Sequence, residues 1–303
     1  MDTKSKIILI AGPTASGKSN FAIKIANKIS GEIINADSMQ IYKELKILTA
    51  RPNKKNQKKI RHYLYGFQSV KRNFSTGTWL KLVIKKVKEI QKKNKVPIVV
   101  GGTGLYFRAL TEGLVKIPTV PLKIRNEVRS LQEKIGQKKF YKKLIKIDPL
   151  VKNKINYNDV QRSIRAFEIK KFTKKSMIKW FSKTKTFFDI NTFLKIYLDF
   201  PRAKLIERIN QRVDMMFKEG AISEVIKFNK LKVKKQNSSN KVIGIQEIGR
   251  YLNGELSLNE AKEQICIKTR QYAKRQTTWA RGQMQSWYKI DPNHLNLVLK
   301  KFK

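Results

Sequence analysis

The chain has 303 residues and a strongly basic composition, in which 67 Lys and Arg residues against 22 Asp and Glu residues give a formal net charge of +45 at pH 7. A hydrophobic content of 41% and an aromatic content of 10% exclude a disordered polyelectrolyte and predict a globular protein of one large domain or two. No apolar run approaches the roughly 20 residues that span a bilayer. The single cysteine, Cys266, excludes an intrachain disulfide. Together these features predict a cytoplasmic protein with no membrane segment.

The excess of positive charge has two explanations, and the sequence leaves both open. Part of it reflects a bias toward lysine, with 52 Lys but only 15 Arg, as a low-GC genome would favour. A field of this size also attracts polyanions. Because the charge is spread along the chain rather than gathered on one amphipathic basic helix, a nucleic acid is favoured over an anionic membrane as the partner.

The first predicted element is a strand over residues 6–11. It runs into the stretch Gly12-Pro13-Thr14-Ala15-Ser16-Gly17-Lys18-Ser19, and an amphipathic helical pattern follows at once. This is the strand, loop and helix order of a P-loop, which makes a chance glycine-rich turn a poor alternative. Backbone amides of such a loop form a pocket for phosphate oxygens, while Lys18 adds a positive charge and the hydroxyl of Ser19 can ligate Mg²⁺. The stretch therefore predicts a site for a phosphorylated ligand.

A second predicted strand over residues 32–36 ends at Asp37, and Ser38, Met39 and Gln40 follow. Ligands of open α/β sheets bind beyond the carboxyl ends of the strands, so Asp37 is expected beside the phosphate loop. An Asp in this position is also a common turn former or helix cap, and position alone does not separate the two roles.

Another glycine-rich turn follows the next predicted helix and strand. Helical spacing over residues 74–93, with Ser75 as the cap, leads to a short β-branched strand over 96–100. Gly101-Gly102-Thr103-Gly104 then opens a helix over 105–112. Such glycines often only permit tight packing, but next to a P-loop they favour a second wall of the same site.

From residue 119 to 190 the pattern is helical and rich in lysine, and a strand over 193–198 and a long helix then resume the alternation. The predicted fold is therefore α/β, with a P-loop NTPase-like parallel sheet flanked by helices. Residues 1–118 and 191–303 would form its core, with a helical insertion domain over 119–190. Near the chain's end, residues 269–281 mix basic, amide and aromatic side chains on a helix, which suits RNA contact, although an ordinary amphipathic helix gives the same pattern.

Several of these stretches together resemble the tRNA isopentenyltransferase (tRNA dimethylallyltransferase) family. In chain order the matching stretches are the P-loop, Asp37-Ser38-Met39-Gln40-Ile41-Tyr42, Thr49-Ala50-Arg51-Pro52, Gly101-Gly102-Thr103-Gly104-Leu105-Tyr106, Asn158-Asp159-Val160-Gln161-Arg162, Arg212-Val213-Asp214 and Thr269 to Trp279. The P-loop alone is shared with many unrelated proteins, whereas the combination is selective.

The resemblance implies transfer of a dimethylallyl group from dimethylallyl diphosphate to N6 of the adenine on the 3′ side of the anticodon, in tRNAs that read codons beginning with U. It implies that Mg²⁺ and the P-loop hold a diphosphate leaving group, that Asp37 is the general base, and that the amide of Gln40 reads the adenine edge. It also implies a partner, the tRNA anticodon stem-loop, and we expect a cytoplasmic monomer.

The site residues implied by the resemblance fall into four groups. The catalytic residues are Asp37, Thr14, Lys18 and Arg212; the diphosphate- or nucleotide-binding residues are Gly12, Pro13, Thr14, Ala15, Ser16, Gly17, Lys18 and Ser19; the tRNA-binding residues are Asp37, Ser38, Met39, Gln40, Thr103, Arg125, Gln161, Arg162, Ser163, Ile164 and Arg165; and the metal ligand is Ser19. For Arg162 and Arg165 the alternative is an exposed salt-bridged helix face, because i, i+3 spacing supports that as well.

The sequence departs from the family pattern at two places. Leu48 and Arg51 stand where the family usually has glycine and lysine, and Gly244-Ile245-Gln246-Glu247 lacks the aromatic and the basic residue of the corresponding element. Two other classes of protein compete with the resemblance. A P-loop kinase would bind ATP and phosphorylate an acceptor, and a non-catalytic RNA-binding module would keep the loop as a relic.

Overall fold

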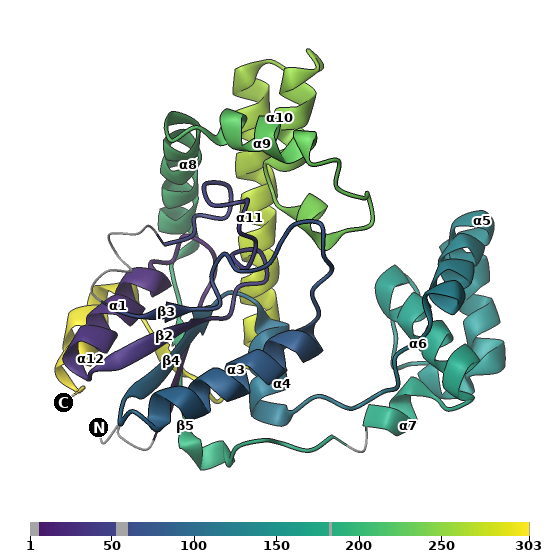
Figure 1. The fold of residues 1–303 in the computed structure, drawn as a ribbon, viewed down its shortest axis with the longest axis horizontal. Helices are drawn as coiled ribbons and strands as arrows, with labels where there is room; N and C mark the ends of the chain where they lie inside the picture. The colour runs from purple at the N-terminus through teal and green to yellow at the C-terminus, as the bar shows by residue number, and fades with distance from the viewer. Residues whose placement is uncertain (1–5, 53–59, 182–183, 303) are drawn as a thin grey trace. The chain divides into compact units, whose positions relative to one another are not determined.

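A six-stranded parallel sheet in the order β3-β2-β4-β1-β5-β6 forms the centre of the protein (Figure 1). The structure is a computed structural model that describes residues 6–52, 60–181 and 184–302. The strands are β1 (Ile7–Ala11), β2 (Gly31–Asn35), β3 (His62–Tyr63), β4 (Val96–Gly101), β5 (Phe193–Leu198) and β6 (Tyr288–Ile290). The sheet confirms the predicted α/β fold with a P-loop strand.

The P-loop strand β1 lies in the middle of the sheet, between β4 and β5. Every residue of β1, β2 and β4 is buried, as expected of parallel strands covered on both faces. The register pairs Ala11 with Gly101 and Asn35 with Val100, so that β1, β2 and β4 end side by side. The loops that follow these three strands therefore meet at one edge of the sheet.

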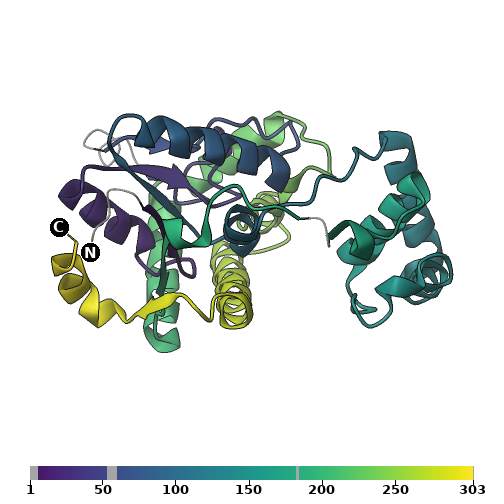
Figure 2. The same ribbon diagram turned by 90° about the horizontal axis from the view of Figure 1, so that it is seen from below.

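Helices cover both faces of the sheet (Figures 1 and 2). On one face α1 (Lys18–Lys28) and α12 (Leu295–Lys300) share an apolar core with the strands. The other face carries α3 (Thr76–Gln91), whose first turn is capped by Ser75, and α4 (Gly104–Glu112). The indole of Trp79 in α3 donates a hydrogen bond to the carbonyl of Asn35 at 2.8 Å and so anchors the helix to the end of β2.

Four more helices follow β5 and form a second apolar core of this unit. They are α8 (Arg202–Lys218), α9 (Ala221–Lys230), α10 (Ile245–Leu252) and α11 (Leu258–Gln283). Elsewhere along the chain and between these helices, short 3₁₀ helices lie at Pro149–Val151, Ile190–Thr192, Ser238–Lys241 and Pro292–His294. Buried side chains of α8, α9, α10 and α11 pack on the segment 41–48, which follows the Asp37 turn. This packing covers the loops at the end of the sheet with the helices that carry Arg212 and the 269–281 segment.

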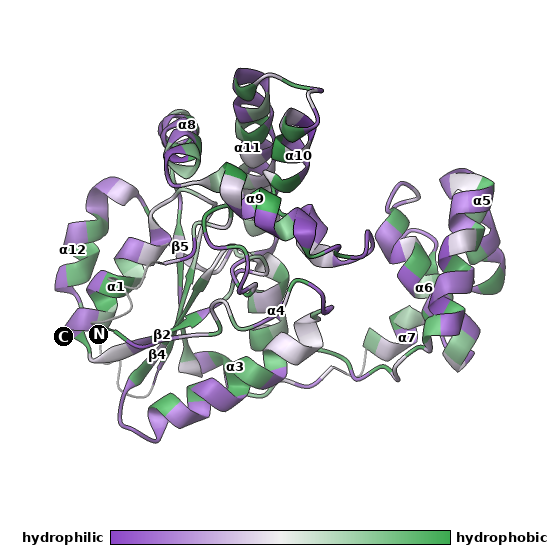
Figure 3. Cartoon of the chain, turned by 45° about the horizontal axis from the view of Figure 1, so that its top comes forward, coloured by the Kyte–Doolittle hydropathy of each residue, from purple (hydrophilic) through white to green (hydrophobic). Residues whose placement is uncertain are grey.

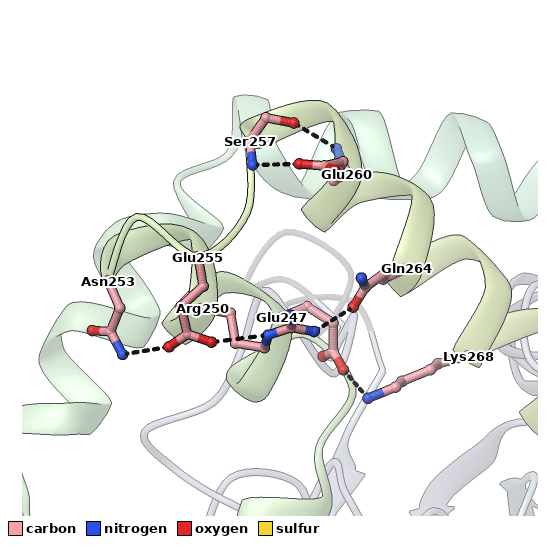
Figure 4. A network of polar contacts seen from close by, with 8 residues as sticks. All are labelled: Glu247, Arg250, Asn253, Glu255, Ser257, Glu260, Gln264 and Lys268. Atoms are coloured by element: carbon pink, nitrogen blue, oxygen red, sulfur yellow. Dashed lines mark hydrogen bonds and ion pairs between the residues drawn. The ribbon is translucent and has the colours of Figure 1, made fainter.

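A network of polar contacts fixes the N-terminal half of α11 to α10 (Figure 4). The buried carboxylate of Glu247 accepts hydrogen bonds from Lys268 and, at 2.8 Å, from the backbone amide of Gly244. Arg250 donates to Glu255 and to Gln264. Ser257 and Glu260 form a capping box at the start of α11, which satisfies two of the free backbone groups of that helix end.

Residues 112–187 form a second compact unit, and residues 1–111 and 188–303 form the first. The second unit contains α5 (Leu122–Ile147), interrupted at Gly136, α6 (Val160–Thr173) and α7 (Met177–Phe181). It has its own core, in which the rings of Phe140 and Phe167 stack with their centroids 5.1 Å apart. The boundaries fall at Glu112 and Phe187, where the sequence suggested 119 and 190.

Hydrophobic and hydrophilic residues alternate in bands along the helices (Figure 3), so most helices have one face for packing and one for water. Within the described parts of the chain, no helix combines the length and the apolar character needed to cross a membrane.

Candidate active site

A cavity of about 520 Å³ opens where β1, β2 and β4 end. Its lining includes Thr14, Lys18 and Ser19 of the P-loop, Asp37 after β2, Arg212 of α8 and Tyr272 of α11. Five of these six were predicted as site residues, and the fold brings them together from three separate regions of the sequence. The cavity is the candidate active site.

The P-loop keeps a conformation that regular secondary structure does not impose. Gly17, the residue before α1, has φ of 82° and Ala15 has φ of 62°, both in the left-handed region that costs an L residue energy. The amide of Ser16 donates to the carbonyl of Pro13 at 3.2 Å, and the ammonium group of Lys18 donates to the same carbonyl at 3.0 Å. The loop is thus closed by two hydrogen bonds to the carbonyl of Pro13.

Thr14 is held by two residues that are distant in sequence. A guanidinium nitrogen of Arg212 donates to the Thr14 hydroxyl at 2.8 Å. The backbone amide of Thr14 donates to the side-chain oxygen of Gln276 at 2.7 Å. The first bond connects the loop to α8 and the second connects it to α11.

Two cations and one carboxylate face each other in the cavity. Burial lowers the pKa of Lys18 to about 8; the negative charge of Asp37 opposes this effect, and the positive charge of Arg212 adds to it. Burial also lowers the pKa of Arg212, again against the effect of Asp37. The cavity therefore holds an excess of buried positive charge, which a bound diphosphate would neutralise.

The lowered pKa of Lys18 predicts a pH dependence of diphosphate binding. Above pH 8 the free protein loses the charge of Lys18, whereas a bound anion restores it, so binding at pH 9 is expected to take up a proton at this lysine and affinity is expected to fall as pH rises. Calorimetry with inorganic pyrophosphate in buffers of different ionisation enthalpy measures the uptake. Lys18→Met is expected to remove this component; an unchanged uptake in that variant would assign the proton to pyrophosphate itself.

Asp37 has a local structural role as well as a place in the cavity. Its carboxylate accepts from the amide of Met39 at 2.9 Å, and its own amide donates to the side chain of Asn35 at 2.8 Å. Its negative charge also affects three neighbouring phenols. Burial is the main cause that raises the pKa values of Tyr65, Tyr106 and Tyr272, and the charge of Asp37 raises them further. Asp37 therefore forms a local turn and also lines the cavity beside the P-loop.

A second cavity of about 320 Å³ adjoins the first, since both are lined by Met39, Tyr272 and Arg275. Ser38 and Thr103 line the second cavity and are bonded to each other, with the Ser38 amide donating to the Thr103 hydroxyl at 2.9 Å. These two predicted tRNA-binding residues thus lie together, while Asp37, the residue before Ser38, lines the first cavity.

Gln40 lines the cavity, and its side-chain amide also contacts the backbone of a nearby turn. Its nitrogen donates to the carbonyls of Thr49 and Ala50 at 2.9 and 3.2 Å, which fixes the turn beside the cavity. Arg51, one of the departures from the family pattern, donates to the carbonyl of Tyr42 at 2.8 Å, and Ile245, another, is buried in the second core. Leu48 lines the same cavity as the P-loop, whereas Arg51 is accommodated by a backbone contact and Ile245 by packing.

The predicted tRNA-binding residues of the second unit have mixed exposure. Gln161 and Arg162 are exposed, and Arg162 pairs with Asp159 at 3.4 Å. Ser163 and Ile164 are buried, so their side chains pack inside the unit instead of lying on its surface. Any contact at these two positions would depend on the backbone or on their neighbours.

Arg125 and Arg165 converge on a buried carboxylate that sequence reasoning missed. Glu168, with a side chain only 2% exposed, lies 3.7 Å from Arg125, 3.8 Å from Arg129 and 3.1 Å from Arg165. The three arginine side chains remain about 40% exposed. Three cations around one anion leave a net positive cluster at the surface of the unit, and the salt-bridge alternative for Arg165 is confirmed as a contact.

Gln276 was also missed as a site residue. It lies inside the 269–281 segment, but nothing in the sequence shows which side chains of that helix face the P-loop. Besides accepting from Thr14, it donates to the carbonyl of Gly102 at 2.9 Å and so joins the two glycine-rich loops.

The fold is α/β and P-loop-like, and a basic cavity lies at the end of its parallel sheet. The family model described as IPP transferase matches residues 40–283. The tRNA dimethylallyltransferase of Pelagibacter ubique is 64% identical over 303 residues, which cover 100% of this chain and 97% of the relative. That of Rickettsia massiliae is 45% identical and covers 93% and 78% of the two chains.

Two solved structures share the fold. The tRNA isopentenylpyrophosphate transferase of Bacillus halodurans has a TM-score of 0.70 and 30% identity, covering 98% of this chain and 95% of the other. A eukaryotic dimethylallyltransferase acting on tRNA has a TM-score of 0.81 and 29% identity, covering 94% and 73%. The chain therefore belongs to the IPP transferase family, the tRNA dimethylallyltransferases.

Proposed function

We propose that the protein transfers the dimethylallyl group of dimethylallyl diphosphate to N6 of the adenine on the 3′ side of the anticodon, in tRNAs that read codons beginning with U. Prenyl transfer to tRNA is the reaction for which the matching relatives are named. The observation that carries the proposal is the single cavity in which a phosphate loop, two cations and a carboxylate face each other. This is the set of groups that departure of diphosphate and deprotonation of an amine require.

The leaving group is the part of the substrate that the P-loop suits best. Breaking the allylic C–O bond leaves negative charge on diphosphate, and preorganised donors at the place where charge develops are usually the largest contribution to catalysis. Loop amides, Lys18 and Arg212 are such donors. The fixed contact between Arg212 and Thr14 keeps that guanidinium at the loop.

Asp37 suits the second half of the reaction. The exocyclic amine of adenine is a weak nucleophile, and its proton must leave as the new C–N bond forms. A carboxylate in the cavity can accept that proton as a general base. The target base must leave the stack of the anticodon loop to reach it, and the adjoining cavity beside Ser38 and Thr103 offers a place for the purine.

The oxygen donors at the site fit Mg²⁺ in the way that phosphate-binding enzymes hold it. Among the described residues there is no cluster of three or more His, Cys, Asp or Glu side chains that could cage a metal. Mg²⁺ commonly keeps several waters and binds through few protein oxygens plus substrate phosphates. Ser19 and Asp37, which line the same cavity, would supply such oxygens, and the ion would supply charge neutralisation for the departing diphosphate.

The RNA partner is expected to bind through phosphate contacts of the second unit. Changing Arg162 and Arg165 together to Ala is expected to weaken tRNA binding and to lower the slope of log K against log salt by one to two, because each phosphate contact releases about one counterion. Filter binding over a salt series measures the slope. Lys170→Ala with Lys171→Ala on the same helix is the charge-matched control. An equal change of the salt slope in both double variants would show that only the net charge of the helix matters.

One assay tests the function against its rivals. The protein is incubated with unmodified tRNA, Mg²⁺ and either dimethylallyl diphosphate or ATP, and the nucleosides are analysed by mass. Dimethylallyl adenosine from the diphosphate alone is the expected result. A product that forms only with ATP and carries a phosphoryl group would identify a kinase. Binding of tRNA without either product would identify an RNA-binding module. We also propose a cytoplasmic monomer, since one chain supplies all the residues of the cavity; light scattering tests the mass.

A further inference from the structure

Gln276 occupies an unusual position between the two glycine-rich loops. Its side-chain oxygen accepts from the amide of Thr14 at 2.7 Å and its nitrogen donates to the carbonyl of Gly102 at 2.9 Å. Both ends of one amide are therefore used, each by the backbone of a different loop. The lack of a side chain at Gly102 makes this possible, since a Cβ there would lie 2.1 Å from the amide nitrogen of Gln276.

The helix that carries Gln276 is held as one body. Its N-terminal half is fixed to α10 through Glu247, Lys268 and the Arg250 contacts (Figure 4). Its C-terminal half presses the indole of Trp279 on Gly104, where a Cβ would lie 2.2 Å from the ring. A small displacement of α11 would therefore move side chains that contact both glycine-rich loops.

The same helix presents cations outward. Arg275 is exposed and lines the second cavity with Trp279, whereas the exposed Lys274 and Arg281 line another cavity beside α8. On the proposed function, the side of Arg275 and Trp279 is the one on which the RNA would lie. On this view Gln276 belongs to a helix that faces RNA. One of its two hydrogen bonds goes to the loop that faces diphosphate, and the other goes to the second glycine-rich loop.

We propose that Gln276 is the positioning residue of the P-loop and that it couples the binding of RNA to the binding of prenyl diphosphate. The coupling rests on the proposed function, because it needs both substrates. The P-loop backbone is strained at Ala15, so it depends on external contacts to keep its amides in place. RNA that fixes α11 fixes Gln276, and Gln276 fixes Thr14 and with it the phosphate cradle. By linkage, diphosphate raises RNA affinity by the same factor.

The first test measures this coupling without any turnover. The affinity of the full chain for inorganic pyrophosphate with Mg²⁺ is measured by calorimetry, with and without an unmodified anticodon stem-loop RNA. In the unaltered protein the RNA is expected to tighten pyrophosphate binding about fivefold or more, within the range typical of coupled sites. In Gln276→Met, which keeps the volume but loses both bonds, the two affinities are expected to become equal and both weaker. Gln283→Met, an exposed glutamine of the same helix, is the matched control.

The kinetic readout separates positioning from simple loss of structure. Gln276→Met is expected to raise KM for dimethylallyl diphosphate about tenfold. By linkage KM for tRNA is expected to rise about fivefold, whereas RNA affinity measured without diphosphate is expected to change less than twofold. A merely structural role would lower the amount of active enzyme and leave both KM values unchanged. A loss confined to tRNA binding would make Gln276 an RNA contact, and either result overturns the proposal.

A double-mutant cycle with Gly102 keeps the proposal testable if the methionine variant folds poorly. Gly102→Ala places a Cβ against the amide of Gln276 and is expected to weaken pyrophosphate binding about as much as Gln276→Ala does. In the double variant the obstructing amide is gone, and the next atom near the Cβ is the carbonyl of Gly12 at an ordinary 3.4 Å. The double variant is therefore expected to be no worse than Gln276→Ala alone. Additive losses would show that the two residues act independently and would overturn the proposal.

The two proposals can fail separately. If the unaltered protein makes no dimethylallyl adenosine yet pyrophosphate affinity still depends on RNA and on Gln276, the reaction is wrong and the coupling stands. If the protein prenylates tRNA but pyrophosphate affinity is the same with and without RNA, the coupling is wrong and the reaction stands.

Discussion

Replacing Asp37 by Asn is expected to slow prenyl transfer by about three orders of magnitude, within the range of 10² to 10⁴ that general bases contribute. Asparagine has nearly the same shape, and its side-chain oxygen can still accept from the amide of Met39, so the turn is kept. Binding of pyrophosphate without Mg²⁺ is expected to stay equal or to tighten, because the variant removes a negative charge that acts on both Lys18 and Arg212. Single-turnover assays and calorimetry measure the two effects.

Asp189→Asn is the matched control for this change. Asp189 accepts from the amide two residues ahead, at 2.7 Å, in the same way that Asp37 does, but it does not line the cavity. Its replacement is expected to leave the rate within twofold. A rate for Asp37→Asn that also falls less than about tenfold would remove Asp37 from the role of base and leave it as a turn former.

Replacing Arg212 by Met is expected to lower kcat/KM for dimethylallyl diphosphate by about 10²- to 10³-fold, which corresponds to roughly 3–4 kcal/mol of lost transition-state stabilisation. The variant removes one of the two buried cations of the cavity and also the donor to the Thr14 hydroxyl at 2.8 Å. Affinity for tRNA alone is expected to change little. Steady-state kinetics with each substrate varied in turn measures the effect.

Lys218→Met, at the exposed end of the same helix, controls for the loss of one positive charge from α8. In Arg212→Met the pKa of Lys18 is also expected to rise, because the positive charge of Arg212 helps to lower it. An Arg212→Met variant with unchanged kinetics would mean that the loop amides and Lys18 stabilise the diphosphate without it.

Local patterns in the sequence were enough to predict the P-loop and the four central strands β2, β4, β1 and β5, but not the edge strands β3 and β6. The apolar strand, the loop and the amphipathic helix follow each other within residues 6–29, so short-range rules of periodicity and turn chemistry apply. Ser75 caps α3 as predicted because capping depends on residues only three apart. The position of Asp37 followed from the rule that parallel strands end at one edge of the sheet.

The rest depends on contacts that no local pattern encodes. The helical signal of residues 269–281 was visible, but the face that meets the P-loop is set by the packing of α11 on α8 and α10, and Gln276 could not be singled out. Likewise the i, i+3 spacing of Arg162 and Arg165 gave no sign that Arg165 turns toward the buried Glu168, together with two arginines of α5. Gln40 formed bonds with a nearby turn whose course the sequence did not define.

The two side chains that hold Thr14 lie 198 and 262 residues further along the chain. On the ribosome, the first strand and its loop therefore emerge long before the groups that shape them. The strand β5, which flanks β1 on one side, also arrives only after the whole second unit. All residues of the second unit are therefore synthesised before Arg212 and Gln276 can contact Thr14, and a chain terminated ahead of α11 lacks the Gln276 contact.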